Sequence, residues 1–340
     1  MTEREAMMRA LELAAQPGLP LGPNPRVGCV LLSPSGDVVA EGWHRGAGTP
    51  HAEADALARA GRAARGTTAV VTLEPCNHTG RTGPCAAALI EAGVRRVVYA
   101  HGDPNPVASG GAASLRAAGI EVAEGLLADE ARRINRGWLH GLAHGRPFVT
   151  WKFATTLDGY SAAADGTSKW ISNSAARRDV HRLRLECDVV LAGTSTVLTD
   201  DPQLSARGDD GQPLARELQP LRAVMGLRPV PQTAKVLDDS AETVVLATRD
   251  LTEALTGLFG LGRRHVLLEG GPTLAAAFMA AGLVDEVVAY VAPVLLGAGQ
   301  RAVADLGIGT IADALRLRVT DTAVLWDVGE EPTMRLTLEP

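Results

Sequence analysis

The sequence predicts an α/β protein with two domains. Short apolar, β-rich runs alternate with helical patterns along most of the chain, which is typical of helices packed on β-sheets. The length of 340 residues exceeds the roughly 250–300 residues at which a single core stops growing. A polar stretch with Gly and Pro, from His144 to Pro147, separates two such alternating patterns. We therefore expect one domain over residues 1–145 and a second over residues 146–340.

The elements of the first domain follow from local signals. Thr2 and Glu5 have the spacing of a capping box, so a short helix should begin there and end before Pro17. The following apolar runs and turn residues predict further strands and helices. We expect strands over 27–32, 38–41, 68–73 and 94–100, and helices over 51–64, 85–92 and 129–143, with Pro84 at the first position of the helix 85–92.

A second α/β pattern begins after Pro147. We expect strands over 149–154, 189–192, 221–225, 243–247, 265–268 and 286–292, helices over 174–185 and from Thr273, and a loop over 208–220. The strand ending at Leu268 leads to paired glycines before Pro272, and such a turn lets backbone N–H groups approach a phosphate at a helix N-terminus. The spacing is not that of the G-x-G-x-x-G fingerprint, and on spacing alone a glycine turn without a ligand is favoured.

Composition and charge exclude several classes of protein. The net charge of −6 is not that of a nucleic-acid or acidic-membrane binder, and no apolar run approaches the ~20 residues of a membrane span. The first residues show no apolar signal segment. Four cysteines are too few for a disulfide scaffold. We expect a cytoplasmic protein with no nucleic-acid or membrane partner, whose cysteines are free to bind a metal or to pack.

His51, Glu53, Cys76 and Cys85 predict the chemistry. A catalytic zinc site uses three imidazole, thiolate or carboxylate ligands and keeps an open position for water. One His and two Cys supply that number, and zinc lowers the pKa of its bound water to about 7. Glu53, two residues beyond His51, can take a proton from this water and give it to a leaving amine. These residues predict a zinc-dependent hydrolytic deaminase.

Two alternatives remain open on the residues alone. The zinc-deaminase pattern is His-x-Glu with Pro-Cys-x-x-Cys, whereas eight residues separate Cys76 from Cys85. A deaminase of nucleic-acid bases needs a basic groove with stacking aromatics, and the net charge of −6 with 3 Tyr and 4 Phe argues against it. The second alternative is a zinc-stabilised structural protein. Its metal would be bound by four protein ligands, and Glu53 would have no function there.

The motifs resemble those of the bifunctional riboflavin-biosynthesis deaminase/reductases. The segment from Thr72 to Cys85, with His51-Ala-Glu53, is similar to the family's deaminase half, and the longer loop between the cysteines is a family feature. The resemblance implies a cytidine-deaminase-like α/β/α domain at the N-terminus. It also implies that the substrate is bound by Asn24, Arg81, Asp103 and Asn105, of which the Asn and Asp residues also suit simple turns.

The second half resembles the reductase half of the same family, in segments such as Trp151 to Gly159 and Thr194 to Pro202. This resemblance implies a dihydrofolate-reductase-like fold, NADPH as cofactor and a homodimer. It implies cofactor contacts from Ala154, Trp170, Thr196, Asp200, Gly270, Gly271, Pro272 and Thr273, and substrate contacts from Lys152, Ser168, Arg184, Leu204, Arg207 and Glu269. Three of these residues also have a structural explanation: Trp170 could pack in the core, Arg184 could form a surface ion pair, and Arg207 could be a solvated loop residue.

The resemblance thus implies two consecutive reactions on one chain. The first is hydrolytic deamination of 2,5-diamino-6-(5-phosphoribosylamino)pyrimidin-4(3H)-one, a small phosphoribosylated pyrimidine. The second is NADPH-dependent reduction of its ribosyl group to a ribityl chain. The cofactors expected are Zn²⁺ in the first domain and NADPH in the second. No general acid stands out in the second half.

Overall fold

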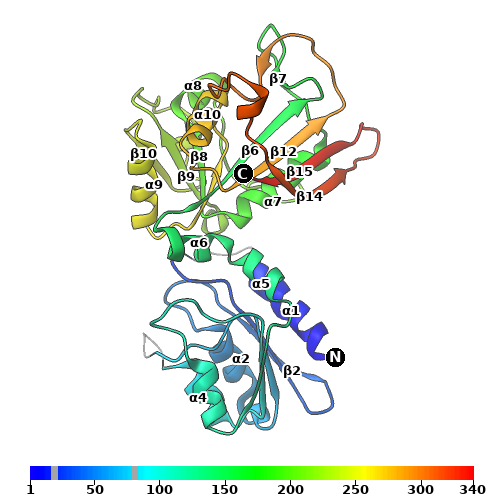
Figure 1. Ribbon diagram of the computed structural model, residues 1–340, viewed down its shortest axis with the longest axis vertical. Coiled ribbons are helices and arrows are strands. Elements are labelled where there is room, and N and C mark those ends of the chain that lie inside the picture. Colours follow the sequence, from blue (N-terminus) through cyan, green and yellow to red (C-terminus); the bar gives the residue numbers. More distant parts are fainter. Residues whose placement is uncertain (17–21, 79–82) are drawn as a thin grey trace. The chain divides into compact units, whose positions relative to one another are not determined.

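The computed structural model describes residues 1–16, 22–78 and 83–340. The chain forms two compact units, Met1–Gly145 and Arg146–Pro340, each with its own sheet and core. Figure 1 labels the elements of both units.

The first unit contains a five-stranded sheet in the order β2-β1-β3-β4-β5. Strand β1 is antiparallel to β2 and β3, whereas β3, β4 and β5 are parallel. The strands are β1 (Gly28–Leu32), β2 (Val38–Trp43), β3 (Thr68–Val71), β4 (Arg96–Tyr99) and β5 (Glu121–Glu124). The helices are α1 (Glu3–Ala15), α2 (Ala52–Ala60), α3 (Cys85–Ala92), α4 (Gly111–Ala117), α5 (Ala128–Ile134) and α6 (Arg136–His144), with a 3₁₀ turn η1 (Gly61–Ala64) after α2.

The sheet of the first unit is covered on both faces. Val30 and Leu32 of β1 pack in a cluster with residues of α1 and α5, while Cys29 and Leu31 pack with residues of α2, α3 and α4. This alternation follows from the two-residue period of a strand, whose side chains point to opposite faces. The apolar run of β1 is therefore buried throughout, and the unit is an α/β/α sandwich.

Several predicted elements of the first unit are confirmed, and some are not. Thr2 and Glu5 form the capping box of α1. The prediction of a single helix over 129–143 is wrong, because two helices, α5 and α6, cover these residues and are separated at Asn135. The Asn135 side chain accepts from the backbone N–H of Arg26 at 2.7 Å and donates to its carbonyl at 2.9 Å. Pro84 caps α3 instead of occupying its first position. The short elements α4 and β5 were not predicted.

The second unit contains an eight-stranded sheet in the order β10-β9-β8-β11-β6-β12-β15-β14. The first six strands of that order are parallel, β15 is antiparallel to its neighbour β12, and β14 is antiparallel to β15. Its strands are β6 (Phe148–Thr156), β8 (Val189–Gly193), β9 (Leu221–Met225), β10 (Thr243–Leu246), β11 (His265–Leu268), β12 (Glu286–Ala292), β14 (Arg318–Leu325) and β15 (Thr333–Glu339). Strands β7 (Tyr160–Ala162) and β13 (Gln300–Arg301) form a separate pair.

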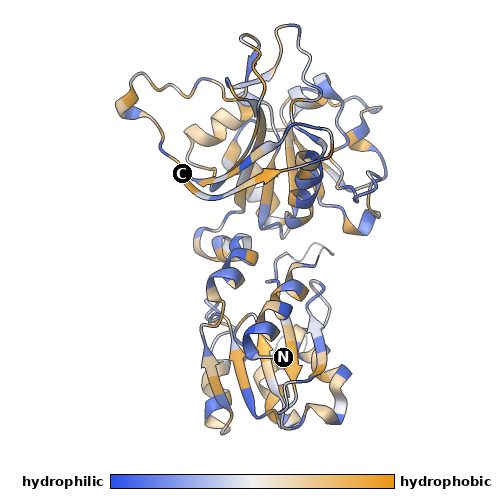
Figure 2. Cartoon of the chain, turned by 90° about the vertical axis from the view of Figure 1, so that its right-hand side faces the viewer, coloured by the Kyte–Doolittle hydropathy of each residue, from blue (hydrophilic) through white to orange (hydrophobic). Residues whose placement is uncertain are grey.

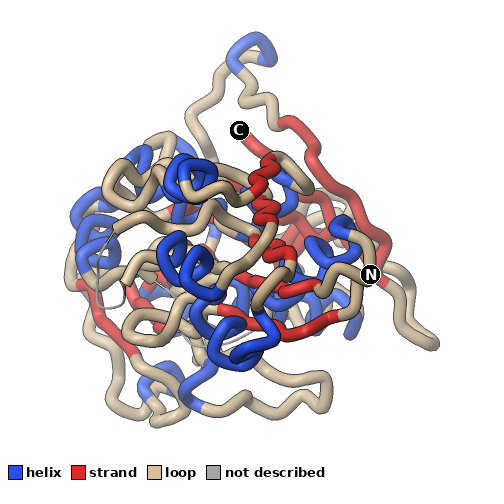
Figure 3. The backbone as a smooth tube through the Cα atoms, turned by 90° about the horizontal axis from the view of Figure 1, so that it is seen from below, coloured by secondary structure: helices blue, strands red, loops and turns tan. Residues whose placement is uncertain are grey.

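Helices cover both faces of this second sheet. Helices α9 (Leu251–Gly260) and α10 (Pro272–Ala280) pack in one apolar cluster with the sheet, and α7 (Ser174–Glu186) packs in another with Leu267 and Tyr290. A further short helix, α8 (Thr194–Asp200), follows β8, and 3₁₀ turns lie at η2 (Arg216–Leu218), η3 (Lys235–Leu237) and η4 (Ile311–Asp313). Several central strands are largely hydrophobic (Figure 2), and loops make up much of the backbone (Figure 3).

The central strands of this unit agree with the sequence-based expectation, and β9, β11 and β12 have the predicted bounds. The elements that were not predicted include α8, α9, β14 and β15. Strand β14 has mostly exposed residues, so it lacks the continuous apolar run by which a buried strand is recognised. Within the described residues, every helix is too short or too polar to cross a membrane.

Candidate functional site

In the first unit, three elements bring His51, Cys76 and Cys85 together. His51 caps the start of α2, Cys85 is the first residue of α3, and Cys76 lies in the loop that follows β3. The His51 Nδ1 atom lies 3.6 Å from the Cys76 Sγ and 3.3 Å from the Cys85 Sγ. All three ligand atoms lie within 4.8 Å of one another. These residues are far apart in sequence, so the close approach is produced by the fold.

The two thiols cannot both ionise easily without a cation. Hydrogen bonds from the Cys85 thiol and the His51 ring lower the pKa of Cys76 to about 4, and the Cys85 backbone N–H also donates to the Cys76 sulfur at 3.4 Å. The hydrogen bond to Cys76, together with burial, raises the pKa of Cys85. A divalent cation between the sulfurs removes this conflict, because it binds both as thiolates. One imidazole and two thiolates are ligands that suit zinc.

Glu53 lies in the first turn of α2, beside the three ligand residues. Its side chain is buried, and burial raises the pKa of its carboxyl group to about 7. The Cys85 thiol contacts the same carboxylate. A carboxyl group with a pKa near neutrality can accept a proton and give it up again during one reaction cycle.

His44 holds one of the predicted substrate residues. Its Nδ1 lies 3.0 Å from the carbonyl oxygen of Pro50, which can only accept, so this nitrogen carries the proton. Its Nε2 therefore accepts from the side-chain amide of Asn24, at 3.0 Å. The amide oxygen of Asn24 has no hydrogen-bond donor among the described residues, so it can accept from another partner. The sequence did not predict this contact, because the spacing of His44 from the His51-Ala-Glu53 motif gives no signal of it.

Glu74 orders the loop that contains two other predicted substrate residues. Its buried carboxylate accepts from the backbone N–H groups of Asp103, Gly110 and Ala112, at 3.2, 3.2 and 3.0 Å. Asp103 in turn accepts from the Asn105 backbone at 2.8 Å. No role for Glu74 was predicted, although it lies two residues before Cys76. Arg81, the remaining predicted residue, lies outside the described residues.

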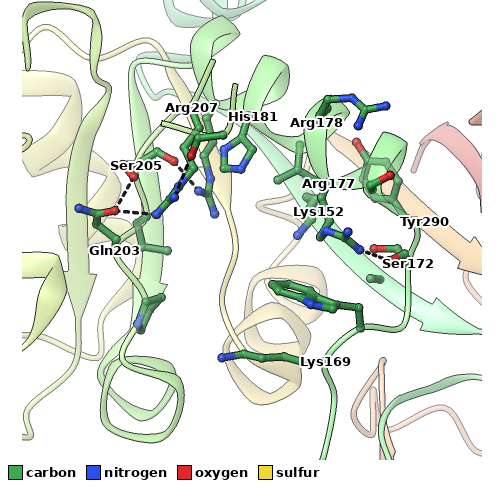
Figure 4. A pocket seen from close by; sticks show the side chains of 18 of the residues that line it. Lys152, Lys169, Ser172, Arg177, Arg178, His181, Gln203, Ser205, Arg207 and Tyr290 are labelled. Carbon is green, nitrogen blue, oxygen red and sulfur yellow. Dashed lines mark hydrogen bonds between the residues drawn. The ribbon is translucent and has the colours of Figure 1, made fainter. Parts of the chain in front are cut away.

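The second unit contains two adjoining pockets. The pocket lined by the turn Gly270–Thr273, here called the glycine-turn pocket, has a volume of about 780 Å³. The pocket lined by one side of helix α7, here called the α7 pocket, has a volume of about 950 Å³ (Figure 4). The two share five lining residues, namely Lys152, Ala154, Ser161, Ser168 and Asp200. Molecules bound in the two pockets therefore meet at this common wall.

The glycine turn presents backbone N–H groups at the start of α10. Pro272 has no N–H group, and Ala275 donates to the Gly271 carbonyl, so Thr273 and Leu274 have the first-turn amides without an intrahelical acceptor. Gly271 donates to the Thr196 hydroxyl at 3.1 Å. A Cβ atom on Gly270 would lie 2.9 Å from the Cδ2 atom of Leu274, so the Leu274 side chain would have to shift to admit it. Such a turn suits the phosphates of a dinucleotide.

Glu269 is surrounded by two cations at the end of β11. Its carboxylate accepts from the Arg184 guanidinium at 2.6 and 2.9 Å and from the Lys152 ammonium at 3.5 Å. Burial alone raises the pKa of Glu269, but Arg184 and Lys152 outweigh it and lower the pKa to about 2. Arg184 is thus held in place by an acid that also pairs with Lys152.

The structure groups most, but not all, of the predicted residues as expected. The predicted cofactor residues line the glycine-turn pocket, except that Trp170 lines the α7 pocket, where the Arg177 guanidinium lies 4.6 Å from its ring centre. The predicted substrate residues line the α7 pocket, except that Glu269 lines the other. His181, which sequence reasoning missed, also lines the α7 pocket (Figure 4). Its Nδ1 is buried without a hydrogen-bond partner among the described residues, and burial lowers the pKa of its ring to about 4.

Comparisons with known protein families match both halves of the chain. Residues 1–101 match the cytidine and deoxycytidylate deaminase zinc-binding region, and residues 147–327 match the RibD C-terminal domain. The riboflavin biosynthesis protein RibD of Mycobacterium tuberculosis is 52% identical over 313 residues, covering 92% of this chain and 91% of the relative. The Escherichia coli protein of the same name is 40% identical, covering 92% of this chain and 94% of the relative.

Solved structures of similar proteins cover nearly the whole chain. Acinetobacter baumannii RibD is 40% identical and superposes with a TM-score of 0.87, over 99% of this chain and 98% of that one. A Thermotoga maritima protein described as a diaminohydroxyphosphoribosylaminopyrimidine deaminase/5-amino-6-(5-phosphoribosylamino)uracil reductase is 32% identical, with a TM-score of 0.88 and the same coverage.

These matches confirm the expected fold class, with a cytidine-deaminase-like domain followed by a dihydrofolate-reductase-like domain. They also confirm the expected activities and cofactors, which are hydrolytic deamination with zinc and reduction with NADPH. The chain belongs to the RibD family of bifunctional riboflavin biosynthesis enzymes.

Proposed function

We propose that His51, Cys76 and Cys85 bind the zinc ion and that Glu53 transfers protons during deamination. The observation that supports this most is the convergence of the three ligand atoms within 4.8 Å, next to a buried carboxyl group. A zinc ion with three protein ligands keeps one position for water and makes that water acidic near neutral pH. Of the two alternatives left open by the sequence, the structural zinc site does not explain the place of Glu53, because such a site does not need this residue.

The substrate in this proposal is the phosphoribosylated diaminopyrimidinone. Water forms a C–O bond at the ring carbon that bears the 2-amino group, and the C–N bond then breaks. Glu53 takes the proton from the water and delivers it to the amino nitrogen, which leaves as ammonia. The substrate is bound by four residues in this proposal: Asn24, Arg81, Asp103 and Asn105. His44 orients Asn24, and Glu74 orders the loop that contains Asp103 and Asn105. Each is a hydrogen-bonding group suited to a polar heterocycle or a phosphate.

The test of this assignment is Glu53→Gln. The amide is similar in size but cannot accept and return a proton, so deamination should fall by about 100-fold or more while zinc content stays near one per chain. Zinc is measured by metal analysis, and deamination by the ammonia released. The matched control is Glu91→Gln, because Glu91 is an exposed residue near the end of α3. Turnover retained by Glu53→Gln with zinc bound would remove Glu53 from the mechanism.

We further propose that the activities divide between residues 1–145 and 146–340, and that the glycine-turn pocket binds NADPH while the α7 pocket binds the deaminated substrate. Support comes from the backbone amides at the glycine turn and from the cations Arg184 and Arg207 in the α7 pocket. The bound cofactor supplies a hydride. The nicotinamide and the sugar meet at the common wall, which includes Lys152, Ala154, Ser168 and Asp200. Trp170 lies on the substrate side of this wall.

In the reduction, the hydride reaches the anomeric carbon, the bond from that carbon to the ring oxygen breaks, and the oxygen gains a proton. Arg207, whose guanidinium is steadied by Gln203 at 2.8 Å and by the Gly211 carbonyl at 3.0 Å, is placed to bind the substrate phosphate. Leu204 is buried beside it. Mass spectrometry of the reaction tests both steps: a deaminated product without NADPH and a deaminated, reduced product with it are expected. Deamination alone would contradict the assignment of the second unit.

We propose that the chain forms a homodimer through the exposed edge of the second sheet. Strand β14 is an edge strand, and an uncovered edge of eight residues invites pairing with another chain. Large apolar side chains are exposed on it and just after it, namely Val319, Val324, Trp326 and Val328. Light scattering should give twice the mass of one chain, and Trp326→Asp with Val324→Asp should reduce it to that of a monomer.

We also place the protein in the cytoplasm, where NADPH and phosphorylated sugars are available. Cell fractionation with a periplasmic and a membrane marker tests this. Recovery of the protein with either marker would contradict it.

A further inference from the structure

The glycine-turn pocket extends across five neighbouring strands, β6, β11, β8, β9 and β10, which are adjacent in that order. Its lining residues lie at or just after the ends of β11, β8, β9 and β10, and within β6 from Trp151 onward, where Trp151 pairs with the last residue of β11. Neighbouring strands lie about 4.8 Å apart, so four spacings give a length of roughly 19 Å. This is long enough for an extended dinucleotide. The nicotinamide end lies at β6, where the α7 pocket adjoins, so the adenosine end lies at β9 and β10.

Two arginines stand at this adenosine end. Arg228 follows β9 and Arg249 follows β10, and both side chains are exposed and line the pocket. The Arg228 guanidinium donates to the Ser195 hydroxyl, a neutral partner. Among the residues that the structure describes, neither arginine forms an ion pair with a carboxylate. Both positive charges are therefore left for a ligand.

The acidic groups near these arginines are engaged elsewhere. Asp250 caps helix α9 and accepts from the backbone N–H groups of Thr252 and Glu253, at 2.8 and 3.0 Å. The Glu253 carboxylate accepts from the Thr248 hydroxyl at 2.5 Å. The acidic lining residues, Asp200 and Glu269, belong to the other parts of the pocket, at the common wall and at the end of β11. The end of the pocket at β9 and β10 is therefore lined by cations and by no acid among the described residues.

We propose that Arg228 and Arg249 bind the 2′-phosphate of the adenosine ribose and so make the pocket select NADPH over NADH. This inference rests on the proposed assignment of the glycine-turn pocket to the cofactor. A guanidinium forms paired, charge-assisted hydrogen bonds with phosphate oxygens. NADH has a neutral hydroxyl group at the same position, so it gains nothing from the two charges. Because both arginines are exposed, their effect on affinity should weaken as salt is added.

The experiment replaces each arginine with glutamine, singly and together, in the full-length, zinc-loaded enzyme. KM is measured for NADPH and for NADH in reduction of the deaminated substrate. Each single variant should raise KM for NADPH about tenfold and the double variant about 100-fold, with kcat and the KM for NADH changed less than twofold. The ratio of the two KM values separates phosphate binding from damage to the fold, which affects both cofactors.

A binding measurement without catalysis gives an independent readout. Calorimetry with adenosine 2′,5′-bisphosphate and with adenosine 5′-monophosphate compares two probes that differ at the 2′ position. The double variant should lose affinity for the bisphosphate and keep its affinity for the monophosphate. Arg182→Gln is the matched control, because Arg182 is an exposed arginine on α7 that lines neither pocket, and it should change none of these values.

Two results would overturn the proposal, and they can be told apart. If the double variant keeps the wild-type preference for NADPH, the arginines do not bind the 2′-phosphate, although the pocket can still bind the cofactor. If the wild-type enzyme binds neither adenosine nucleotide, or binds them without being displaced by NADPH, the assignment of the pocket itself fails.

Discussion

Glu269 shows how one residue couples stability to pH. It is the acid between Arg184 and Lys152, and all three side chains are largely buried. Removing the Glu269 carboxylate would leave the Arg184 guanidinium and the Lys152 ammonium largely buried without a counter-ion. Breaking such a buried group of charges costs about 3–5 kcal/mol of unfolding free energy.

Glu269→Gln should therefore lower the unfolding free energy at pH 7 by about 3 kcal/mol, and the loss should depend on pH. The folded-state pKa of Glu269, about 2, is below its value of about 4.3 in an unfolded chain. A lowered pKa stabilises the fold above the unfolded value, and this stabilisation disappears as pH falls through the folded value. The difference between wild type and variant should be constant above about pH 5 and shrink toward pH 2. Denaturant unfolding at several pH values measures it.

The control for this prediction is Glu217→Gln, an exposed carboxylate in the same unit. It should leave the unfolding free energy within about 0.5 kcal/mol of wild type at every pH. A Glu269 variant whose deficit does not change between pH 7 and pH 3 would show that the ion pairs are not the source of the loss.

At the scale of single residues, the candidate site residues that form a motif with a characteristic spacing could be predicted from the sequence, and those outside any motif could not. His51, Glu53, Cys76 and Cys85 form a pattern because the chemistry of a metal fixes the types of its ligands. His44, His181, Arg228 and Arg249 have no such pattern. Their contacts exist because elements distant in the chain meet, as when the ends of β9 and β10 place two arginines at one end of a pocket.

At the scale of elements, the position of His51, which we propose as a zinc ligand, depends on how closely α2 packs on β2. A Cβ atom added to Gly42 of β2 would lie 2.3 Å from the Ala52 carbonyl oxygen and 2.4 Å from the Ala56 backbone nitrogen. These are backbone atoms of α2, so the contact cannot be relieved by moving a side chain. Helix α2 also contains Glu53 and begins at His51.

Gly42→Ala should therefore push α2 away from the sheet. We expect a loss of about 1–3 kcal/mol in unfolding free energy, from overpacking, together with weaker zinc binding because His51 moves away from the two cysteines. Thermal unfolding and competition with a zinc-binding dye measure the two effects. Gly257→Ala is the matched control, since its added Cβ meets nothing within 4 Å and it lies inside helix α9. Unchanged zinc affinity in Gly42→Ala would contradict the dependence on this contact.

The central elements were predictable, and those at the edges were less so. Buried strands such as β11 and β12 are continuous apolar runs, and parallel strands buried on both faces have this composition. The break between α5 and α6 could not be predicted from the sequence. It lies at Asn135, whose side chain hydrogen-bonds to the backbone of Arg26, a residue distant in the chain. Strand β14 was missed because an exposed edge strand has no apolar pattern to show.

At the scale of the whole molecule, the two units have separate cores and separate sites. Removal of zinc by a chelator should therefore abolish deamination while leaving NADPH-dependent reduction of the already deaminated substrate within twofold of its starting rate. Both reactions can be followed on the same sample, by ammonia release and by NADPH absorbance. Zinc added back should restore deamination. A parallel loss of reduction would mean that the metal also maintains the second unit.

The common wall of the glycine-turn and α7 pockets determines the kinetic class of the reduction. Five residues line both pockets, namely Lys152, Ala154, Ser161, Ser168 and Asp200, so a cofactor and a sugar bound as proposed would lie next to each other. We expect the hydride to pass directly from one bound molecule to the other. Such a reaction needs both molecules on the enzyme at once, and so it follows a sequential, ternary-complex scheme. A ping-pong scheme needs a group on the enzyme that stores the hydride after the oxidised cofactor leaves, and the described side chains that line these pockets include no such group.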